Sequence, residues 1–446
     1  MKSLFSGLLA FCVLPVAVLA AGNVTTFSLP NGMDAVVIED HRAPVVTHMV
    51  WYRIGAADEM PGKSGIAHLL EHLMFKGTKK YGPGQFSEIV SANGGSENAF
   101  TSFDYTGYFQ RVAADRLELM MDMESDRMRG LILSEEDATT ERQVVLEERN
   151  SRTENNPGAL FSEQLAAALY LNHPYGIPII GWKHEVEKLT RQDALDWYQK
   201  YYAPNDAILV VAGDVDPENV KALATKYYGA VRPTENLAKR ERPTEPPQLA
   251  ARRLQMSDGR VSQPYVIRTY LAVERNAGDQ KKAAALQILA ELLGGSGLTS
   301  VLGQKLVLDQ KVALQASAFY DGMSLDRSGF GVFVVPAEGV SLQEGEEAMD
   351  AVIADFLQNG IDQDHLVRIK AQIKAAEIYG RDSLQGMARR YGEGLTSGLT
   401  VQDIEDWPTV LQSITADDIM AAAKDVFDRR KSVTGWLMRD ETGEKK

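Results

Sequence analysis

The stretch His68-Leu69-Leu70-Glu71-His72 indicates both a fold and a chemistry. On a helix, residues four positions apart lie on one face, about one turn from each other. His68 and His72 can therefore offer two imidazole nitrogens to one metal ion, for which Zn²⁺ is the natural candidate. Glu71 lies at the edge of the same face, where its carboxylate can reach a water molecule on that metal.

The flanking sequence predicts a helix over 64–76 that packs against a core. Ser64 can cap its start, and Gly77 can end it. Its apolar side comprises Ile66, Leu69, Leu70 and Leu73. The alternative is a surface helix with solvated histidines, but imidazole and carboxylate groups next to a core need a partner, and a metal ion provides one.

A catalytic site with two histidine ligands needs a third donor, for which a carboxylate is usual. The best candidate segment is a glutamate-rich helix predicted over 135–151, with Ser134 as its cap. Glu141 and Glu148 are two turns apart and share a face, whereas Glu147 points about 100° away from Glu148. The alternative is that all these carboxylates are solvated, and spacing alone does not choose among them.

Together these segments resemble the pitrilysin-type zinc peptidases, the inverzincins, which include mitochondrial processing peptidase and insulin-degrading enzyme. The resemblance implies that His68, His72 and Glu148 bind one zinc ion. It further implies that Glu71 is the general base, and that Glu141 supports a ligand histidine. Further matching segments are 75–78, 98–101, 173–175, 201–205 and 210–214. Most of the chain is covered, and its size is similar to that of the short bacterial members.

The segment 98–101 resembles the substrate-binding edge strand of that family. It contains Asn98, Ala99, Phe100 and Thr101. An extended peptide would pair with this edge through main-chain hydrogen bonds, which read little of the peptide's sequence. The alternative is an ordinary strand end.

Two positions depart from the family pattern. Family members carry an Arg and a Tyr seven residues apart after a glycine-rich turn, and this sequence has Val307 and Leu314 there. Neither side chain can donate a hydrogen bond to a developing oxyanion. Tyr320, Arg389 or Tyr391 could substitute, although their spacing does not support it. The resemblance therefore predicts a dimer, preferably a heterodimer with a homologous subunit that lacks the metal motif but carries the Arg and Tyr.

Composition limits the class of protein. A chain of 446 residues with 44% hydrophobic residues is expected to form two or more globular domains. Its net charge of −14 argues against a nucleic-acid-binding protein. The alternation of strand and helix signals predicts an α+β fold of two homologous α/β sandwich halves, each a mixed, largely antiparallel sheet packed with helices. The predicted domains are 21–231 and 251–446, joined by a proline-rich linker over 232–250.

Residues 1–20 read as a signal peptide, with Lys2 before an apolar run and small residues at 18–20. The single cysteine, Cys12, lies inside it, so the mature chain would contain no disulfide bond. We therefore expect an exported, periplasmic bacterial protein without stable membrane insertion after cleavage. A retained N-terminal anchor is the alternative.

The predicted function is a zinc-dependent endopeptidase that hydrolyses peptides or unfolded segments bound in extended form inside a chamber. Two alternatives come from other classes of protein. One is a catalytically inactive assembly or core subunit with the same fold, against which the complete His68, Glu71 and His72 motif argues. The other is a zinc hydrolase acting on small molecules, which the long two-half organisation disfavours.

Overall fold

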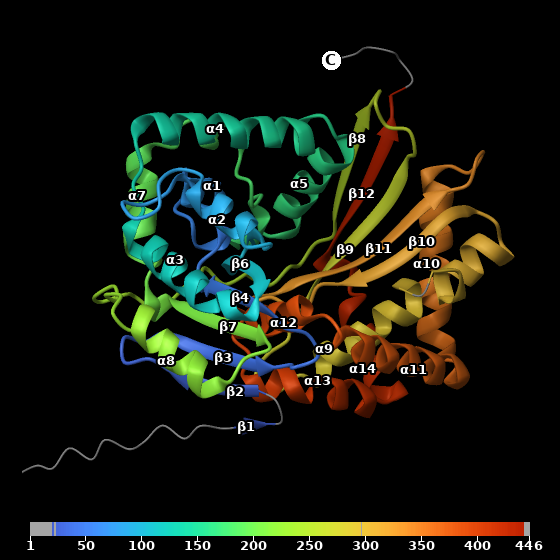
Figure 1. Ribbon diagram of the computed structural model, residues 1–446. Coiled ribbons are helices and arrows are strands. Elements are labelled where there is room, and N and C mark those ends of the chain that lie inside the picture. The colour runs from blue at the N-terminus through green and yellow to red at the C-terminus, as the bar shows by residue number, and fades with distance from the viewer. Residues whose placement is uncertain (1–19, 22–23, 296, 441–446) are drawn as a thin grey trace, which may run out of the picture.

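The computed structural model describes residues 20–21, 24–295 and 297–440. Two mixed β-sheets, each packed with helices, form the molecule (Figure 1). This arrangement confirms the predicted α+β class. The predicted signal peptide lies outside the described residues, apart from Ala20. Within the described residues, no helix is long and apolar enough to cross a membrane.

The first sheet has the strand order β1-β2-β3-β7-β4-β6-β5. Its strands are β1 (Ala20–Ala21), β2 (Val24–Ser28), β3 (Asp34–Glu39), β4 (Val45–Tyr52), β5 (Ser96–Thr101), β6 (Thr106–Ala113) and β7 (Ala207–Gly213). Only the β3–β7 pair is parallel, and all the other neighbours are antiparallel. A hairpin turn at Asn31 and Gly32 joins β2 to β3, and Gly32 adopts a φ of 92° in the turn.

The second sheet repeats the arrangement of the first. Its strands are β8 (Arg252–Asp258), β9 (Tyr265–Ala272), β10 (Ala313–Tyr320), β11 (Ser328–Pro336) and β12 (Ser432–Arg439). They follow the order β10-β11-β9-β12-β8, which matches β5-β6-β4-β7-β3 of the first sheet. In both sheets the last two strands of this series form the single parallel pair. The predicted pair of homologous halves is therefore confirmed, and β5 and β10 are equivalent edge strands.

Eight α-helices lie between β4 and the linker in the described residues. They are α1 (Ile66–Leu73), α2 (Gln85–Ala92), α3 (Leu117–Gly130), α4 (Glu135–Arg149), α5 (Pro157–Leu169), α6 (Lys183–Val186), α7 (Arg191–Tyr201) and α8 (Pro217–Tyr227). The helix predicted over 64–76 is α1 followed by a 3₁₀ turn, Met74–Lys76. The helix predicted over 135–151 is α4, followed by a π-helical turn, Asn150–Glu154.

The second half contributes six further α-helices to the described residues. They are α9 (Lys281–Ala290), α10 (Leu342–Asn359), α11 (Gln363–Gly380), α12 (Leu384–Thr396), α13 (Val401–Ser413) and α14 (Ala416–Val426). α13 contains Pro408, a residue that usually interrupts a helix. Pro408 cannot donate to the carbonyl of Ile404, and Arg390 donates to that carbonyl instead at 3.1 Å.

Two helices cross between the halves. α5, from the first half, packs on the second sheet through Phe161 and Leu165, which contact a cluster containing Val433 and Leu437. α12, from the second half, packs on β4 and β7 of the first sheet (Figure 1). The predicted linker 232–250 contains no helix or strand. We propose the division predicted from sequence, with domains 21–231 and 251–446, although the crossing helices make the two halves pack as one body.

Candidate metal centre

Helix α1 presents the His-x-x-Glu-His motif, but its start is capped differently from the prediction. The N-cap residue is Gly65 with a φ of 89°, whereas Ser64 Oγ accepts a hydrogen bond from the Trp182 amide at 2.9 Å. The carboxylate of Glu59 accepts hydrogen bonds from the amides of Gly65 and Ala67, both at 2.9 Å. The unpaired amides of the first turn therefore bond to Glu59, a residue outside the helix.

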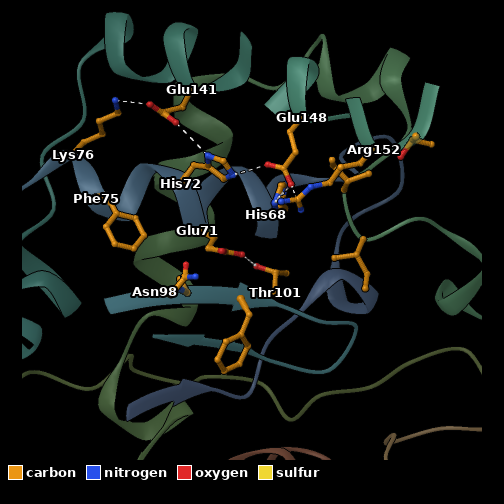
Figure 2. A pocket seen from close by; sticks show the side chains of 15 residues that line it. His68, Glu71, His72, Phe75, Lys76, Asn98, Thr101, Glu141, Glu148 and Arg152 are labelled. Atoms are coloured by element: carbon orange, nitrogen blue, oxygen red, sulfur yellow. Dashed lines mark hydrogen bonds and ion pairs between the residues drawn. The ribbon is translucent and has the colours of Figure 1, made fainter. Parts of the chain in front are cut away.

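The three predicted metal ligands meet where α4 crosses α1 (Figure 2). His68 Nε2 lies 3.7 Å from Glu148 Oε1, and His72 Nε2 lies 3.3 Å from Glu148 Oε2. One potential ligand atom from each of the three residues falls within 4.8 Å of the others. The edge of a tetrahedron with metal–ligand bonds of about 2.1 Å is about 3.4 Å long, so these separations fit one zinc-sized ion.

Glu141, predicted to support a ligand histidine, lies on the other side of the His72 ring. Its Oε2 is 3.3 Å from His72 Nδ1, and its Oε1 pairs with Lys76 Nζ at 2.5 Å. His72 is thus held between two carboxylates of α4, so that Nε2 faces Glu148. Glu147, the alternative left open by the spacing, is exposed.

Burial shifts the pKa of two residues of the motif, His68 and Glu71. It lowers the pKa of His68 to about 3, and the neighbouring charges of His72 and Arg152 act in the same direction. The imidazole of His68 is therefore neutral at pH 7, as a metal ligand must be. Burial also raises the pKa of Glu71. Thr101 donates a hydrogen bond to Glu71 Oε2 at 2.5 Å, which holds the carboxylate beside β5.

Arg152 is a site residue that the sequence reasoning missed. It lies on the π-helical turn after α4, and its guanidinium pairs with Glu148 Oε1 at 2.5 Å. Its side chain is 74% exposed. The spacing of four residues from Glu148 could have revealed this contact, because helical residues at that spacing are neighbours.

The predicted metal ligands and Glu71 line an open cavity of about 770 Å³. Its lining includes all nine predicted site residues: His68, Glu71, His72, Asn98, Ala99, Phe100, Thr101, Glu141 and Glu148. Segment 98–101 belongs to β5, the last strand in the order of the first sheet. The Phe100 ring also packs against Trp51, with centroids 4.8 Å apart.

Val307 and Leu314, at the positions of the family's Arg and Tyr, do not line this cavity. The three residues considered as substitutes have other contacts. Tyr320 donates to the carbonyl of Val273 at 2.6 Å, Arg389 pairs with Glu393 at 2.7 Å, and Tyr391 contacts Glu405 at 3.4 Å. None of these three lines the cavity either.

Comparison with known proteins identifies the family. Residues 35–183 match the family model "Insulinase (Peptidase family M16)", and residues 188–373 match "Peptidase M16 inactive domain". The chain is 31% identical over 416 residues to a zinc protease, PqqE, from Helicobacter pylori, covering 92% of this chain and 91% of the relative. It belongs to peptidase family M16. An uncharacterized zinc protease from Streptomyces coelicolor is 28% identical over 419 residues, covering 93% of this chain and 89% of the relative.

Solved structures agree with this assignment. A protease from Helicobacter pylori superposes with a TM-score of 0.86 at 30% identity, covering 92% of this chain and 98% of the other. The periplasmic protease PqqL from Escherichia coli shares the fold with a TM-score of 0.80 at 19% identity. This M16 chain is covered to 95% but spans only 48% of PqqL, whose chain is about twice as long. The resemblance to pitrilysin-type zinc peptidases and the enzyme class, a zinc protease, are therefore confirmed.

Proposed function

We propose that this M16 protein is a zinc-dependent endopeptidase that hydrolyses peptides or unfolded segments bound in extended form. One observation carries the proposal. Two histidine Nε2 atoms approach one carboxylate at 3.3 and 3.7 Å, in a cavity that also contains Glu71 and the edge strand β5. An extended peptide that paired with β5 would place its carbonyl groups next to this group of side chains.

In this proposal His68, His72 and Glu148 bind one zinc ion per chain. When bound, zinc supplies Lewis acidity and lowers the pKa of a water ligand towards about 7. Glu141 orients His72 through its Nδ1 atom, as carboxylates commonly do for metal-bound histidines.

Glu71 acts as the general base. Its carboxylate accepts a proton from the water that attacks the peptide carbonyl, and then delivers that proton to the amine nitrogen as the C–N bond breaks. The raised pKa of Glu71 makes its carboxylate a better proton acceptor than an exposed glutamate. Thr101 holds one carboxylate oxygen, which leaves the other for the proton transfer.

The proposed assembly is a heterodimer with a homologous subunit that lacks the metal motif and carries the Arg and Tyr. Val307 and Leu314 support this proposal, because neither can donate a hydrogen bond to the transition state. The length of PqqL is consistent with it, since two chains like this one would supply as many units as that single chain.

We also propose export to the periplasm, with no stable membrane insertion after cleavage of the signal peptide 1–20. The apolar N-terminal sequence supports this localisation, and one structural relative, PqqL, is described as periplasmic.

The deciding experiment compares Glu71→Gln with Glu147→Gln, an exposed glutamate on α4. The assay measures the rate at which an unfolded polypeptide is cleaved, with the homologous subunit present. The rate of Glu71→Gln should be about 10² to 10⁴ times lower than that of the wild-type chain. The zinc content should stay near one per chain, and Glu147→Gln should behave as wild type. Unchanged cleavage in Glu71→Gln would exclude the proposed mechanism. Zinc binding without peptide cleavage in any assembly would instead favour the inactive core subunit.

A second comparison tests the partner alone. If the purified chain by itself cleaves peptides as fast as the mixture does, the heterodimer proposal is wrong while the endopeptidase proposal stands.

A further inference from the structure

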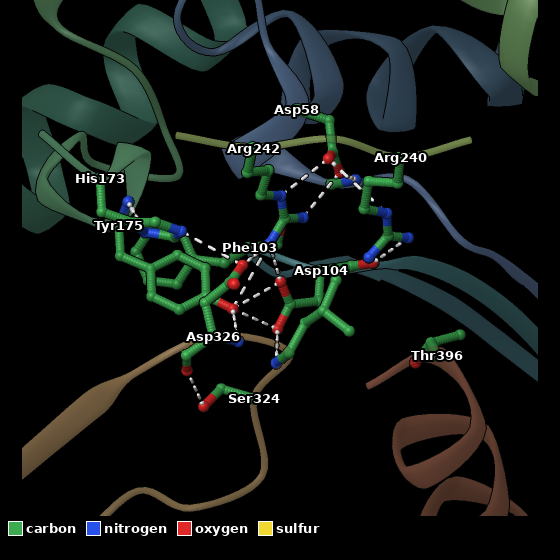
Figure 3. A network of polar contacts seen from close by, with 12 residues as sticks. Asp58, Phe103, Asp104, His173, Tyr175, Arg240, Arg242, Ser324, Asp326 and Thr396 are labelled. Carbon is green, nitrogen blue, oxygen red and sulfur yellow. Dashed lines mark hydrogen bonds and ion pairs between the residues drawn. The ribbon is translucent and has the colours of Figure 1, made fainter. Parts of the chain in front are cut away.

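Arg242, in the predicted linker 232–250, is buried among three carboxylates (Figure 3). Its Nε and one terminal nitrogen donate to the two oxygens of Asp58, both at 2.9 Å. The other terminal nitrogen donates to Asp104 at 2.5 Å and to Asp326 at 3.1 Å. Only 5% of the Arg242 side chain is exposed. Such fork-shaped pairing fixes both the position and the orientation of the partners.

The three carboxylates come from segments far apart in the sequence. Asp58 ends a 3₁₀ turn before α1, Asp104 lies between β5 and β6, and Asp326 lies between β10 and β11 of the second sheet. Asp104 also accepts hydrogen bonds from the Tyr175 hydroxyl at 2.7 Å and from the Leu325 amide at 2.9 Å. One guanidinium therefore joins the linker, the 3₁₀ turn that precedes α1, and loops of both sheets.

The contact with Asp58 leads directly to the metal-binding helix. The next residue is Glu59, whose carboxylate accepts hydrogen bonds from the amides of Gly65 and Ala67 at the start of α1. Gly65, at the N-cap position, has no side chain to do so. A shift of Asp58 and Glu59 would therefore move the first turn of α1, and His68 with it.

A second route leads to Glu71. The amides of Ala56 and Ala57, just before Asp58, donate to the carbonyls of Ser102 and Phe103 at 2.9 and 3.0 Å. Arg242 also donates to the Phe103 carbonyl at 3.3 Å. Ser102 follows Thr101, the residue that holds the Glu71 carboxylate.

We propose that Arg242 is a positioning residue for the metal centre, fixing the start of α1 relative to the end of β5. The proposal rests on the proposed zinc site. Without the Arg242 guanidinium, buried Asp104 loses its ion-pair partner and Asp58 keeps only the longer 3.6 Å pair with Arg240, which is costly for carboxylates away from water. Their segments would then shift towards solvent and carry α1 and Thr101 with them.

The test compares Arg242→Met with Arg260→Met. Met keeps the length of the side chain without its charge, and Arg260 forms a more exposed pair with Asp258. Zinc affinity is measured by competition with a chelator, at a temperature where circular dichroism shows a folded chain. We expect about tenfold weaker zinc binding in Arg242→Met, by analogy with residues that orient metal ligands in other proteins. Arg260→Met should bind zinc as tightly as the wild type.

Two further measurements separate positioning from general destabilisation. In Arg242→Ala, millimolar guanidinium chloride should restore zinc affinity by occupying the vacated site, whereas equal sodium chloride should not. If Arg242→Met does not fold, Arg242→Lys keeps the buried charge without the fork, and its zinc affinity should fall several-fold. A folded Arg242→Met or Arg242→Lys chain with wild-type zinc affinity would overturn the inference. Absence of zinc binding by the wild type would instead overturn the proposed function.

Discussion

Replacement of Gly392 by Ala tests the packing of α12 across the first sheet. Gly392 faces the indole of Trp51, which is fully buried. A Cβ atom at Gly392 would lie 2.0 Å from Trp51 Cε2 and 2.3 Å from Nε1. The ring cannot easily move aside, because it packs against Phe100 and Tyr105 with centroid distances of 4.8 and 5.0 Å.

The expected cost follows from this geometry. Carbon atoms normally approach to about 3.5 Å, so helix and ring must separate by roughly 1.5 Å. Overpacking of a buried site costs about 1–3 kcal/mol, and this displacement belongs at the upper end. Ala gains about 1 kcal/mol over Gly inside a helix. The Gly392→Ala substitution should therefore lower the free energy of unfolding by about 1–2 kcal/mol.

Urea denaturation followed by circular dichroism measures this change, with Gly380→Ala as the matched control. Gly380 ends α11, and a Cβ there would meet no atom within 4 Å. The control should gain up to about 1 kcal/mol from helix propensity alone. Both substitutions replace Gly by Ala in a helix. A decrease in the free energy of unfolding for Gly392→Ala and an increase for Gly380→Ala would therefore isolate the effect of the contact with Trp51. A neutral or stabilising Gly392→Ala would refute the described packing of α12.

Three further substitutions probe other parts of the molecule. Arg152→Ala should tighten zinc binding in chelator competition, because Arg152 competes for Glu148 Oε1, and weaker binding would contradict this view. Burial raises the pKa of Asp206 to about 7, so the folded chain keeps a proton that the unfolded chain loses between pH 4 and 7. Stability should thus fall across that window, and Asp206→Asn should remove up to about 3 kcal/mol of the loss between urea titrations at pH 5 and pH 8. Phe161→Ala should cost about 3–5 kcal/mol in the same assay, since Phe161 is 1% exposed between the halves.

Periodic and local signals in the sequence predicted the two helices, α1 and α4, that carry the proposed metal ligands. Helical spacing alone placed His68 and His72 on one face, and also Glu141 and Glu148, because that spacing is a property of the backbone. Predictions from local sequence failed where a residue outside the helix makes the hydrogen bonds expected of a residue at its start. Glu59, rather than Ser64, accepts hydrogen bonds at the start of α1.

Residues that are distant in the sequence also stabilise α13 and the linker. Pro408 normally argues against a helix, and the chain tolerates it because Arg390, from α12, donates to the freed carbonyl. Arg242 looked like an ordinary charge in a proline-rich linker, because its three carboxylate partners are 84 to 184 residues away. No pattern within a short window contains such partners.

The position of Glu148 links the metal centre to the second sheet. Arg149, the next residue, is buried and pairs with Glu163 of α5 through two hydrogen bonds of 2.8 Å. α5 in turn packs on the second sheet through Phe161. His68 and His72 lie on α1, which packs against β5 of the first sheet. Glu148 is thus linked to the second sheet, whereas His68 and His72 lie on a helix that packs on the first sheet. Any change in the angle between the sheets would alter the separation of Glu148 from the two imidazoles, so metal affinity should depend on contacts, such as those of α5 and Arg242, that hold the halves together.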